Sequence, residues 1–301
     1  MISIGVVAYN EGLSVYQALR SLIVASERCS EPVEIIVVAS GCTDNTIAEA
    51  RRALAHHNQH TLFVENERQG KAAALNKVAD LASGEILVLC DADVRVDSQS
   101  IFSLSKAFME DPELEVASAK VSVLRGPNRV LTKIGELSAQ ALNDYRQLPS
   151  GEGLWMVCGH LYAVKTIAWK DIPEYVVSDD VYIGLRSVSQ GRKIRYIHEA
   201  LVYIYYPQTW GDYFSQKLRN RFARRQLAEG NFQLKQPVRW LGLMLLRKIG
   251  VSALKYLPVI ILDCLVVAIA EISWVFRFRQ SPLWKMIRTS KQVHGLKDDN
   301  T

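Results

Sequence analysis

The sequence has few cysteines and no spacing that would pair them. Five cysteines are spread over 301 residues, and no two of them stand in a CxxC spacing. An odd and scattered set excludes a disulfide-rich secreted scaffold and argues against a zinc site, and it fits reduced thiols in the cytosol. The chain also begins directly on a strand-like run, residues 2–9, without the basic stretch of a signal peptide, so we expect none.

Two common nucleotide-binding signatures are missing as well. The chain contains neither GxGxxG nor GxxxxGK[ST], which argues against a dinucleotide-binding domain and a P-loop. Internal repeats and low-complexity segments are absent too. Hydrophobic residues make up 49% of the chain, which is enough for a sizeable core. This composition argues against a disordered chain.

Negative charge is scarce in the second part of the chain. Residues 1–185 hold 16 Lys and Arg against 24 Asp and Glu, a net charge of −8, whereas residues 186–301 hold 20 against 7, a net charge of +13. This asymmetry favours an acidic front half that uses cations and a basic back half that meets phosphate or anionic lipid. The alternative is a solvated basic face.

Apolar runs and amphipathic stretches alternate through the first hundred residues. Such a pattern predicts βαβ units and a parallel sheet covered on both faces. The predicted strands cover residues 2–9, 33–40, 61–66 and 85–94, and the predicted helices lie within residues 14–25, 47–57 and 67–83. We therefore expect an α/β fold with a mixed, mainly parallel sheet, whose ligand crevice lies beyond the carboxyl ends of the strands.

The pattern is more mixed after residue 115. Strands are predicted over residues 115–124, 154–164 and 193–207, and helices near residues 130–147, 178–190 and 210–230. We assign residues 1–235 to a catalytic domain and residues 236–301 to a basic and hydrophobic helical region.

The C-terminal region contains an apolar stretch, residues 256–276, that is long enough to cross a bilayer. Basic residues precede and follow it, and Tyr256 and Trp274 stand near its ends, as interfacial aromatics do. Asp263 and Glu271 argue against a simple lipid-facing span. A re-entrant or in-plane membrane helix is an equal interpretation, and a soluble buried helix is the alternative.

Two carboxylates, Asp91 and Asp93, end the apolar run of residues 85–94. Side chains at positions i and i+2 of a strand share a face, so both could reach one divalent cation, with diphosphate and water completing its shell. A polar strand end is the simpler alternative.

Three further clusters suggest chemistry. The stretch Arg68-Gln69-Gly70-Lys71 precedes a helix and suits an anion, although it could be a charged turn. Ser178-Asp179-Asp180 opens another helix, where a carboxylate could act as a general base or only as a cap. The basic helix with Arg219, Arg221, Arg224 and Arg225 could bind phosphate or lipid headgroups, or be solvated.

Together the motifs resemble the inverting family 2 glycosyltransferases of the GT-A fold, of the bacterial membrane-associated type. The matching segments are VVAYNEG, SGCTDNT, RQGKAAALN, CDADV, CGHLYAV, SDDVYIGLR and QKLR, in that order over roughly residues 2–230. The resemblance implies a metal-dependent hexosyltransferase that binds Mg²⁺ or Mn²⁺ and a UDP- or GDP-sugar.

The resemblance also implies roles for single residues. Asp180 would be the catalytic base, and Asp91 and Asp93 would hold the metal. Gly159, His160 and Asp179 would line the acceptor side. The donor would be bound by Ala8, Tyr9, Asn10, Glu11, Ser40, Arg68, Lys71, Asp91, Ala92, Gln216 and Arg219.

Two positions depart from the family pattern. Ser40 stands where many members carry an Asp that reads uracil, which leaves the base of the donor open. Asn220 replaces the tryptophan of the QxxRW motif, which is typical of polymer-making synthases. The second departure favours a single addition over a processive reaction.

The resulting hypothesis is an inverting transferase that moves a sugar to a hydroxyl of a glycan or lipid-linked acceptor in polysaccharide or glycolipid biosynthesis. We expect it at the cytoplasmic face of the cell membrane, without a nucleic acid partner. The alternatives are a nucleotidyltransferase on the same fold and a catalytically silent nucleotide-binding membrane protein.

Overall fold

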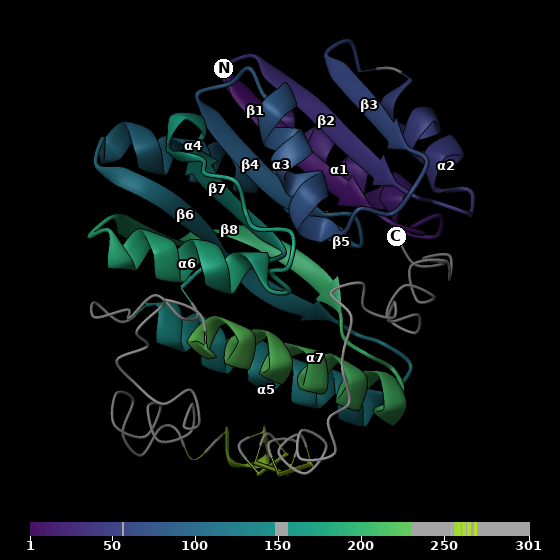
Figure 1. Cartoon of the computed structure of the whole chain (residues 1–301), viewed down its shortest axis with the longest axis vertical. Coiled ribbons are helices and arrows are strands. Elements are labelled where there is room, and N and C mark those ends of the chain that lie inside the picture. The colour runs from purple at the N-terminus through teal and green to yellow at the C-terminus, as the bar shows by residue number, and fades with distance from the viewer. Residues whose placement is uncertain are drawn as a thin grey trace.

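The structure, a computed structural model, describes residues 1–55, 57–147 and 156–229 and separate positions between residues 254 and 269. Helices and strands alternate in the first part of the chain, as predicted (Figure 1). The strands are β1 (Ile2–Ala8), β2 (Val33–Ser40), β3 (His60–Glu65), β4 (Ile86–Asp91), β5 (Val94–Val96), β6 (Leu114–Leu124), β7 (Leu161–Lys165) and β8 (Lys193–Tyr205). The helices are α1 (Val15–Ser26), α2 (Thr46–Leu54), α3 (Lys71–Leu81), α4 (Ser100–Glu110), α5 (Arg129–Arg146), α6 (Asp179–Ser189) and α7 (Trp210–Glu229).

All eight strands belong to one sheet, in the order β3-β2-β1-β4-β7-β6-β8-β5. The first four neighbours pair in parallel, whereas β7 runs antiparallel to both β4 and β6. The mixed, mainly parallel α/β sheet expected from the sequence is therefore confirmed. The strand order reverses at β1, because the chain moves from β1 to β2 and β3 on one side and then returns to β4 on the other. In open α/β sheets such a reversal opens the ligand crevice at the carboxyl ends of the two strands.

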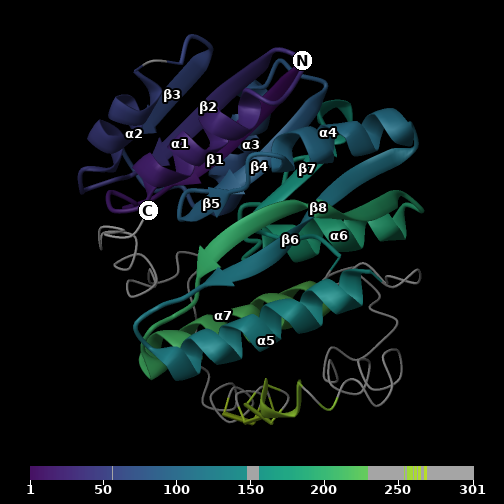
Figure 2. The same cartoon turned by 180° about the vertical axis from the view of Figure 1, so that it is seen from behind.

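The sheet is covered on both faces, since successive side chains of its central strands point in opposite directions. In β4, Val88 and Cys90 join one buried cluster and Leu87 and Leu89 join another. Helices α1, α2 and α4 contribute to the first cluster, and α3, α5 and α6 contribute to the second. Figure 1 accordingly shows α3 and α6 in front of the sheet, and Figure 2 shows α1 and α4 on the other side.

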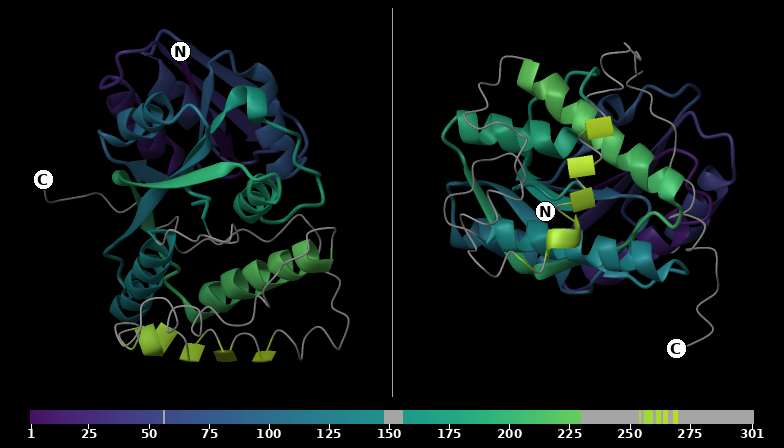
Figure 3. Two further views of the ribbon diagram at one scale, coloured as in Figure 1. Left: turned by 90° about the vertical axis from the view of Figure 1, so that its left-hand side faces the viewer. Right: turned by 90° about the horizontal axis from the view of Figure 1, so that it is seen from below.

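A smaller apolar cluster joins α5 and α7 beyond the sheet. Leu131 and Ile134 of α5 pack with Tyr213 of α7 and with Val259. Tyr256 is fully buried, and its hydroxyl donates a hydrogen bond to Asp144 of α5. Figure 3 shows the described positions of residues 254–269 at the end of the molecule, next to these two helices.

One predicted strand was too long. Of the expected strand over residues 154–164, the described residues 156–160 form a turn and only β7 is extended. The turn closes where the amide of Leu161 donates to the carbonyl of Cys158, and the amide of Cys158 donates to Ser118 Oγ. The apolar composition of this segment reflects burial within a turn, which periodicity alone does not separate from a strand.

The predicted domain boundary at residue 235 and most of the apolar stretch over residues 256–276 lie outside the described residues. Among the described residues, no helix has both the length and the apolar character needed to cross a bilayer.

Candidate active site

The polar clusters that follow β1, β2, β3 and β4 meet at one edge of the sheet. These four strands run parallel and side by side, so their carboxyl ends lie together. The edge where the sequence predicts the ligand crevice therefore carries these clusters together.

The loop after β1 is fixed to the loop after β2. Asn10 adopts a positive φ of 53°, a conformation that asparagine tolerates better than most residues. Its Oδ1 accepts a hydrogen bond from the amide of Thr43 at 2.8 Å. The amide of Glu11 donates to Thr46 Oγ1 at 2.7 Å. These bonds join the two loops into one wall at the carboxyl edge of the sheet.

A cation and a ring form the next part of this wall. The guanidinium carbon of Arg68 lies 3.9 Å from the centroid of the Tyr9 ring, a close cation–π contact. Gly41 makes the approach possible: its φ is 63°, and a Cβ there would lie 2.4 Å from the amide nitrogen of Arg68. Ser40 is buried, and its Oγ accepts a hydrogen bond from the amide of Gln69 at 3.2 Å.

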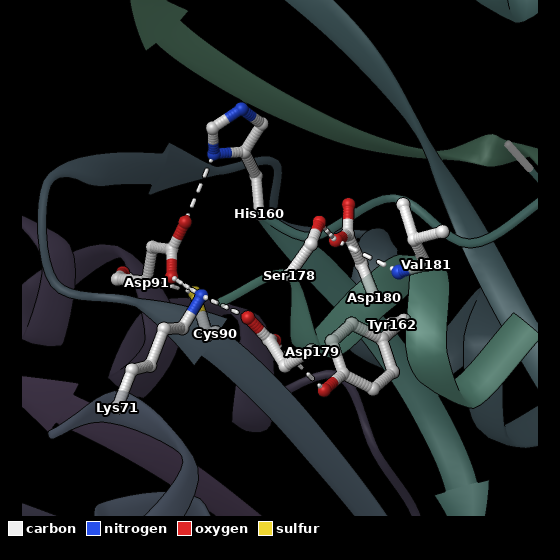
Figure 4. A network of polar contacts seen from close by, with 9 residues as sticks. All are labelled: Lys71, Cys90, Asp91, His160, Tyr162, Ser178, Asp179, Asp180 and Val181. Atoms are coloured by element: carbon white, nitrogen blue, oxygen red, sulfur yellow. Dashed lines mark hydrogen bonds and ion pairs between the residues drawn. The ribbon is translucent and has the colours of Figure 1, made fainter. Parts of the chain in front are cut away.

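Five side chains form a connected polar network beside this wall (Figure 4). Lys71 Nζ lies 2.8 Å from Asp91 Oδ1 and 3.2 Å from Asp179 Oδ1. His160 Nδ1 lies 3.0 Å from Asp91 Oδ2. Tyr162 donates its hydroxyl to Asp179 Oδ2 at 3.4 Å. The network joins the amino ends of α3 and α6 to the carboxyl end of β4.

Local structure places the network's three charged members. Gly70, with a φ of 101°, precedes α3 and allows Lys71 to be its first residue. Asp91 is the last residue of β4, and Asp179 is the first residue of α6. The second acidic pair thus meets the first although 88 positions separate Asp91 from Asp179 in the sequence.

The charges of the network shift one another's protonation. The partial loss of water around its ammonium would lower the pKa of Lys71, but the carboxylates of Asp179 and Asp91 raise it above its ordinary value. Burial would raise the pKa of Asp91, whereas Lys71 and His160 hold it below its usual range. The pKa of Asp179 is raised, because burial outweighs the attraction of Lys71. Asp91 is therefore ionised and Lys71 is protonated at neutral pH.

Asp180 lies beside the network and not within it. Its Oδ1 accepts hydrogen bonds from Ser178 Oγ at 2.7 Å and from the amide of Val181 at 2.9 Å. A Cβ on Gly159 would lie 2.8 Å from Asp180 Oδ2, so this oxygen faces the turn before β7. Among the described residues no hydrogen-bond donor contacts Oδ2, which leaves it as the oxygen that can accept a proton.

The predicted metal ligands lie at the end of β4. The strand ends at Asp91, and Asp93 follows in the turn before β5, so the alternation rule for strands does not orient this pair. In the part of the chain that the structure describes, no group of three or more His, Cys, Asp or Glu side chains is arranged as a metal site. Two carboxylates fit a hard divalent cation that takes its other ligands from diphosphate and water.

The other predicted donor residues divide into two groups. Ala8 and Ala92 are buried at the ends of β1 and β4, beside the crevice. Gln216 and Arg219 are half-buried on α7, and no hydrogen bond or ion pair between described residues joins them to the network.

Two polar residues near the site, Tyr162 and Asp44, were given no role from the sequence. Tyr162 was predicted only as a residue of a strand. The sequence around it does not indicate that its hydroxyl reaches Asp179. Asp44 accepts hydrogen bonds from the amides of Gly12 and Thr46. Its position in the SGCTDNT segment was the available signal, since short polar side chains in such loops often bond to nearby amides.

Comparison with known proteins now adds to this geometry. The model of glycosyl transferase family 2 matches residues 3–160, and that of glycosyl transferase family group 2 matches residues 86–280. Poly-beta-1,6-N-acetyl-D-glucosamine synthases are similar in sequence. The enzyme of Staphylococcus aureus is 24% identical over 216 residues, which is 70% of this chain and 51% of that protein. The enzyme of Staphylococcus epidermidis is 26% identical over 223 residues, which is 72% of this chain and 53% of that protein. The chain thus spans about half the length of these relatives.

Two solved structures share the fold. The mannosyltransferase PcManGT of Pyrobaculum calidifontis, in complex with GDP-Man and Mn²⁺, has a TM-score of 0.57 and 20% identity, over 97% of this chain and 83% of its own. The glucosyl-3-phosphoglycerate synthase of Mycobacterium tuberculosis, in complex with Mg²⁺ and UDP, has a TM-score of 0.51 and 18% identity, over 76% of this chain and 78% of its own. The GT-A fold implied by the sequence motifs is confirmed, and the chain belongs to glycosyl transferase family 2.

Proposed function

We propose that this protein is an inverting, metal-dependent glycosyltransferase that moves one sugar from a nucleotide-sugar to a hydroxyl of a glycan or lipid-linked acceptor. The separation of its acidic residues carries the proposal. Asp91 and Asp179 are charge-paired with Lys71, whereas Asp180 presents Oδ2 toward the turn at Gly159. The residues Asp91 and Asp179, with Lys71, are suited to binding a diphosphate. Asp180 is suited to accepting a proton.

The donor binds along the carboxyl ends of β1 to β4. Tyr9 and Arg68 offer a ring and a planar cation to the nucleoside, and the fixed loop at Asn10 and Glu11 frames it. When bound to Asp91 and Asp93, Mg²⁺ or Mn²⁺ supplies Lewis-acid neutralisation of the departing diphosphate. The metal and nucleotide named for PcManGT and for the mycobacterial synthase support this part of the proposal.

Asp180 acts as the general base. Two hydrogen bonds on Oδ1 hold its carboxylate in orientation, so Oδ2 can take the proton of an acceptor hydroxyl that attacks the anomeric carbon. Gly159 leaves the space that the acceptor needs, and His160 lies next to it on the same turn.

The donor is a sugar linked to uridine diphosphate or guanosine diphosphate. Ser40 has no carboxylate to read uracil, and its hydroxyl is already bonded to the amide of Gln69. Recognition of the base therefore falls to Tyr9, Arg68 and the backbone around Asn10.

The acceptor belongs to cell-surface glycan or glycolipid synthesis, as the similarity to the staphylococcal poly-N-acetylglucosamine synthases suggests. Asn220, in place of the tryptophan of QxxRW, supports a single addition.

The protein works on the cytoplasmic surface of the membrane. The described residues of segment 254–269 bury Tyr256 and Val259 against the fold, and they expose five large apolar side chains on the outside. These are Leu254, Leu257, Ile261, Leu265 and Ile269, at 44–56% exposure. Their spacing of three or four residues makes one apolar stripe. Basic residues before and after the stretch, including Lys248 and Arg277 in the sequence, suit anionic headgroups.

Donor hydrolysis is the direct test of the reaction. The protein is incubated with Mn²⁺ and a panel of UDP- and GDP-sugars, and the release of nucleoside diphosphate is followed for the wild type and for Asp93→Ala. We expect release from one donor and its loss in the variant. A parallel incubation with UTP or GTP and a sugar 1-phosphate tests the alternative, because a nucleotidyltransferase would join them and release pyrophosphate. Nucleotide binding without turnover on any acceptor would indicate a silent binding protein.

A further inference from the structure

Each carboxylate oxygen of Asp91 contacts one nitrogen donor of the protein. Lys71 Nζ contacts Oδ1 at 2.8 Å, and His160 Nδ1 contacts Oδ2 at 3.0 Å. Both nitrogens are placed to donate to it. Each carboxylate oxygen keeps a second lone pair, but a divalent cation that binds Oδ1 would lie next to the positive charge of Lys71 and be repelled by it.

Lys71 is the donor that can leave. Its side chain is 40% exposed, whereas that of Asp91 is 21% exposed and that of Asp179 is 8% exposed. A lysine ammonium on a flexible four-carbon stem can move toward a phosphate and still remain at the crevice. His160 is tied to the same place by its backbone, because its carbonyl accepts a hydrogen bond from the amide of Asp91 at 3.2 Å.

Lys71 also stabilises a second carboxylate. Asp179 is buried, and a buried carboxylate needs a cation or loses its charge. Lys71 lies 3.2 Å from Asp179 and is the ammonium that neutralises it together with Asp91. One positive charge therefore serves two acidic residues from different elements.

We propose that the ammonium of Lys71 is the resident counter-ion of Asp91 and competes with the divalent cation, so that the metal enters with the donor diphosphate and not alone. The proposal rests on the proposed function in taking Asp91 as a metal ligand. When the donor arrives, its diphosphate gives the ammonium a new anionic partner, and Asp91 Oδ1 becomes available to the metal. Metal and nucleotide then favour each other's binding, and this coupling is reciprocal.

The test measures Mn²⁺ binding without any sugar. Free Mn²⁺ is followed by electron paramagnetic resonance in titrations of the wild type, Lys71→Met and Lys77→Met, with and without saturating UDP or GDP. Lys77 is the matched control, because it lies on the same helix and its Nζ lies 4.7 Å from the Phe63 ring centroid. Without nucleotide, Lys71→Met should bind Mn²⁺ about tenfold more tightly than the wild type, since a competing positive charge is gone. Lys77→Met should match the wild type.

The nucleotide should also tighten Mn²⁺ binding by a larger factor in the wild type than in Lys71→Met. A merely structural role of Lys71 would weaken metal binding on removal, so a gain separates the two roles. Lys71→Arg keeps the charge and should bind Mn²⁺ as weakly as the wild type. The double variant Lys71→Met/Asp91→Asn should not show the tighter Mn²⁺ binding of Lys71→Met. That result would assign the effect of Lys71 to Asp91.

Equal or weaker Mn²⁺ binding by a folded Lys71→Met protein would overturn the proposal, and so would a gain that survives in the double variant. If Lys71→Met does not fold, the Mn²⁺ affinity of the wild type is compared with and without nucleoside diphosphate. Equal affinities would contradict the proposed competition. None of these measurements needs sugar transfer. A failed donor panel would therefore reject the proposed function and leave the competition intact, and the reverse outcome is equally distinguishable.

Discussion

The carboxyl edge of the sheet and the surface formed by the described residues of segment 254–269 differ in the side chains that they present. At the edge, charges are paired within the protein: Lys71 contacts Asp91 and Asp179, and Arg68 lies over a ring. On the surface, apolar side chains such as Ile261 and Leu265 are about half exposed. The edge thus pairs its charges within the protein, whereas the described residues of this surface leave apolar side chains exposed.

Under the proposed function, the two regions serve different parts of the reaction. A prepared polar crevice lowers the cost of binding and orienting a diphosphate. An apolar stripe gives little geometric specificity but gains free energy from every side chain that leaves water. Variants at the edge should therefore change the rate of sugar transfer or the binding of the donor. Variants on the apolar stripe should change only the binding of the protein to membranes.

The largest effect is expected at the edge, for Asp180→Asn. Loss of a positioned general base costs about 10²–10⁴-fold in rate. Sugar transfer should fall by that factor, while nucleoside diphosphate binding and the melting temperature should change little. Asp171→Asn, at an exposed carboxylate in the loop before α6, should keep wild-type activity. Wild-type turnover in Asp180→Asn would remove Asp180 from the role of base.

A smaller loss is expected for Gly159→Ala. The new Cβ would lie 2.8 Å from Asp180 Oδ2 and 3.0 Å from its Cγ, so the carboxylate has to move. A displacement of this kind costs about a hundredfold in rate, because the base no longer lies in line with the hydroxyl. Mn²⁺ affinity should stay unchanged. Gly211→Ala on α7 is the matched control, since nothing lies within 4 Å of its new Cβ. Equal rates in both variants would show that Asp180 does not need its present position.

Much of the fold could be predicted from the sequence, because the first half obeys simple rules. The buried strands β1, β2 and β4 are continuous apolar runs, and amphipathic helices separate them. A parallel sheet with Asn10 and Asp91 at its carboxyl edge therefore followed from βαβ connectivity, although the order of the strands did not. The turn before β7 did not follow. Its residues are as apolar as a strand, and the hydrogen bonds of Cys158 with Leu161 and Ser118 distinguish them.

The site was predictable by residue but not by contact. Lys71, Asp91 and Asp179 were each singled out from local motifs, yet the motifs do not say that one ammonium bridges both carboxylates. That contact depends on how α6 packs beside β4, which involves residues far apart in the chain. The hydroxyl of Tyr162 was missed for the same reason.

On the surface, the double variant Ile261→Glu/Leu265→Glu tests the apolar stripe. Binding to vesicles with anionic lipid should weaken at least tenfold, because two partly buried apolar side chains contribute roughly 1 kcal/mol or more each in the lipid. Donor hydrolysis in detergent-free buffer should stay unchanged. Ile167→Glu is the control, because Ile167 is 92% exposed in the short helical turn Thr166–Ala168, away from the stripe. Equal sedimentation of both variants with the vesicles would argue for a partner other than lipid.

The smallest effect is expected for Ser40→Ala, which sharpens the view of the edge as prepared in advance. The change removes the acceptor for the Gln69 amide in a buried place and should lower the free energy of unfolding by about 1 kcal/mol. The loop that carries Arg68 then loses part of its restraint, so the KM for the donor should rise roughly threefold while kcat stays constant. Ser215→Ala, whose exposed hydroxyl bonds only to the carbonyl of Gly211 within α7, should change neither quantity. A fall in kcat with an unchanged KM would instead mean that Ser40 acts on the reacting atoms, and the edge would then prepare the chemistry as well as the binding.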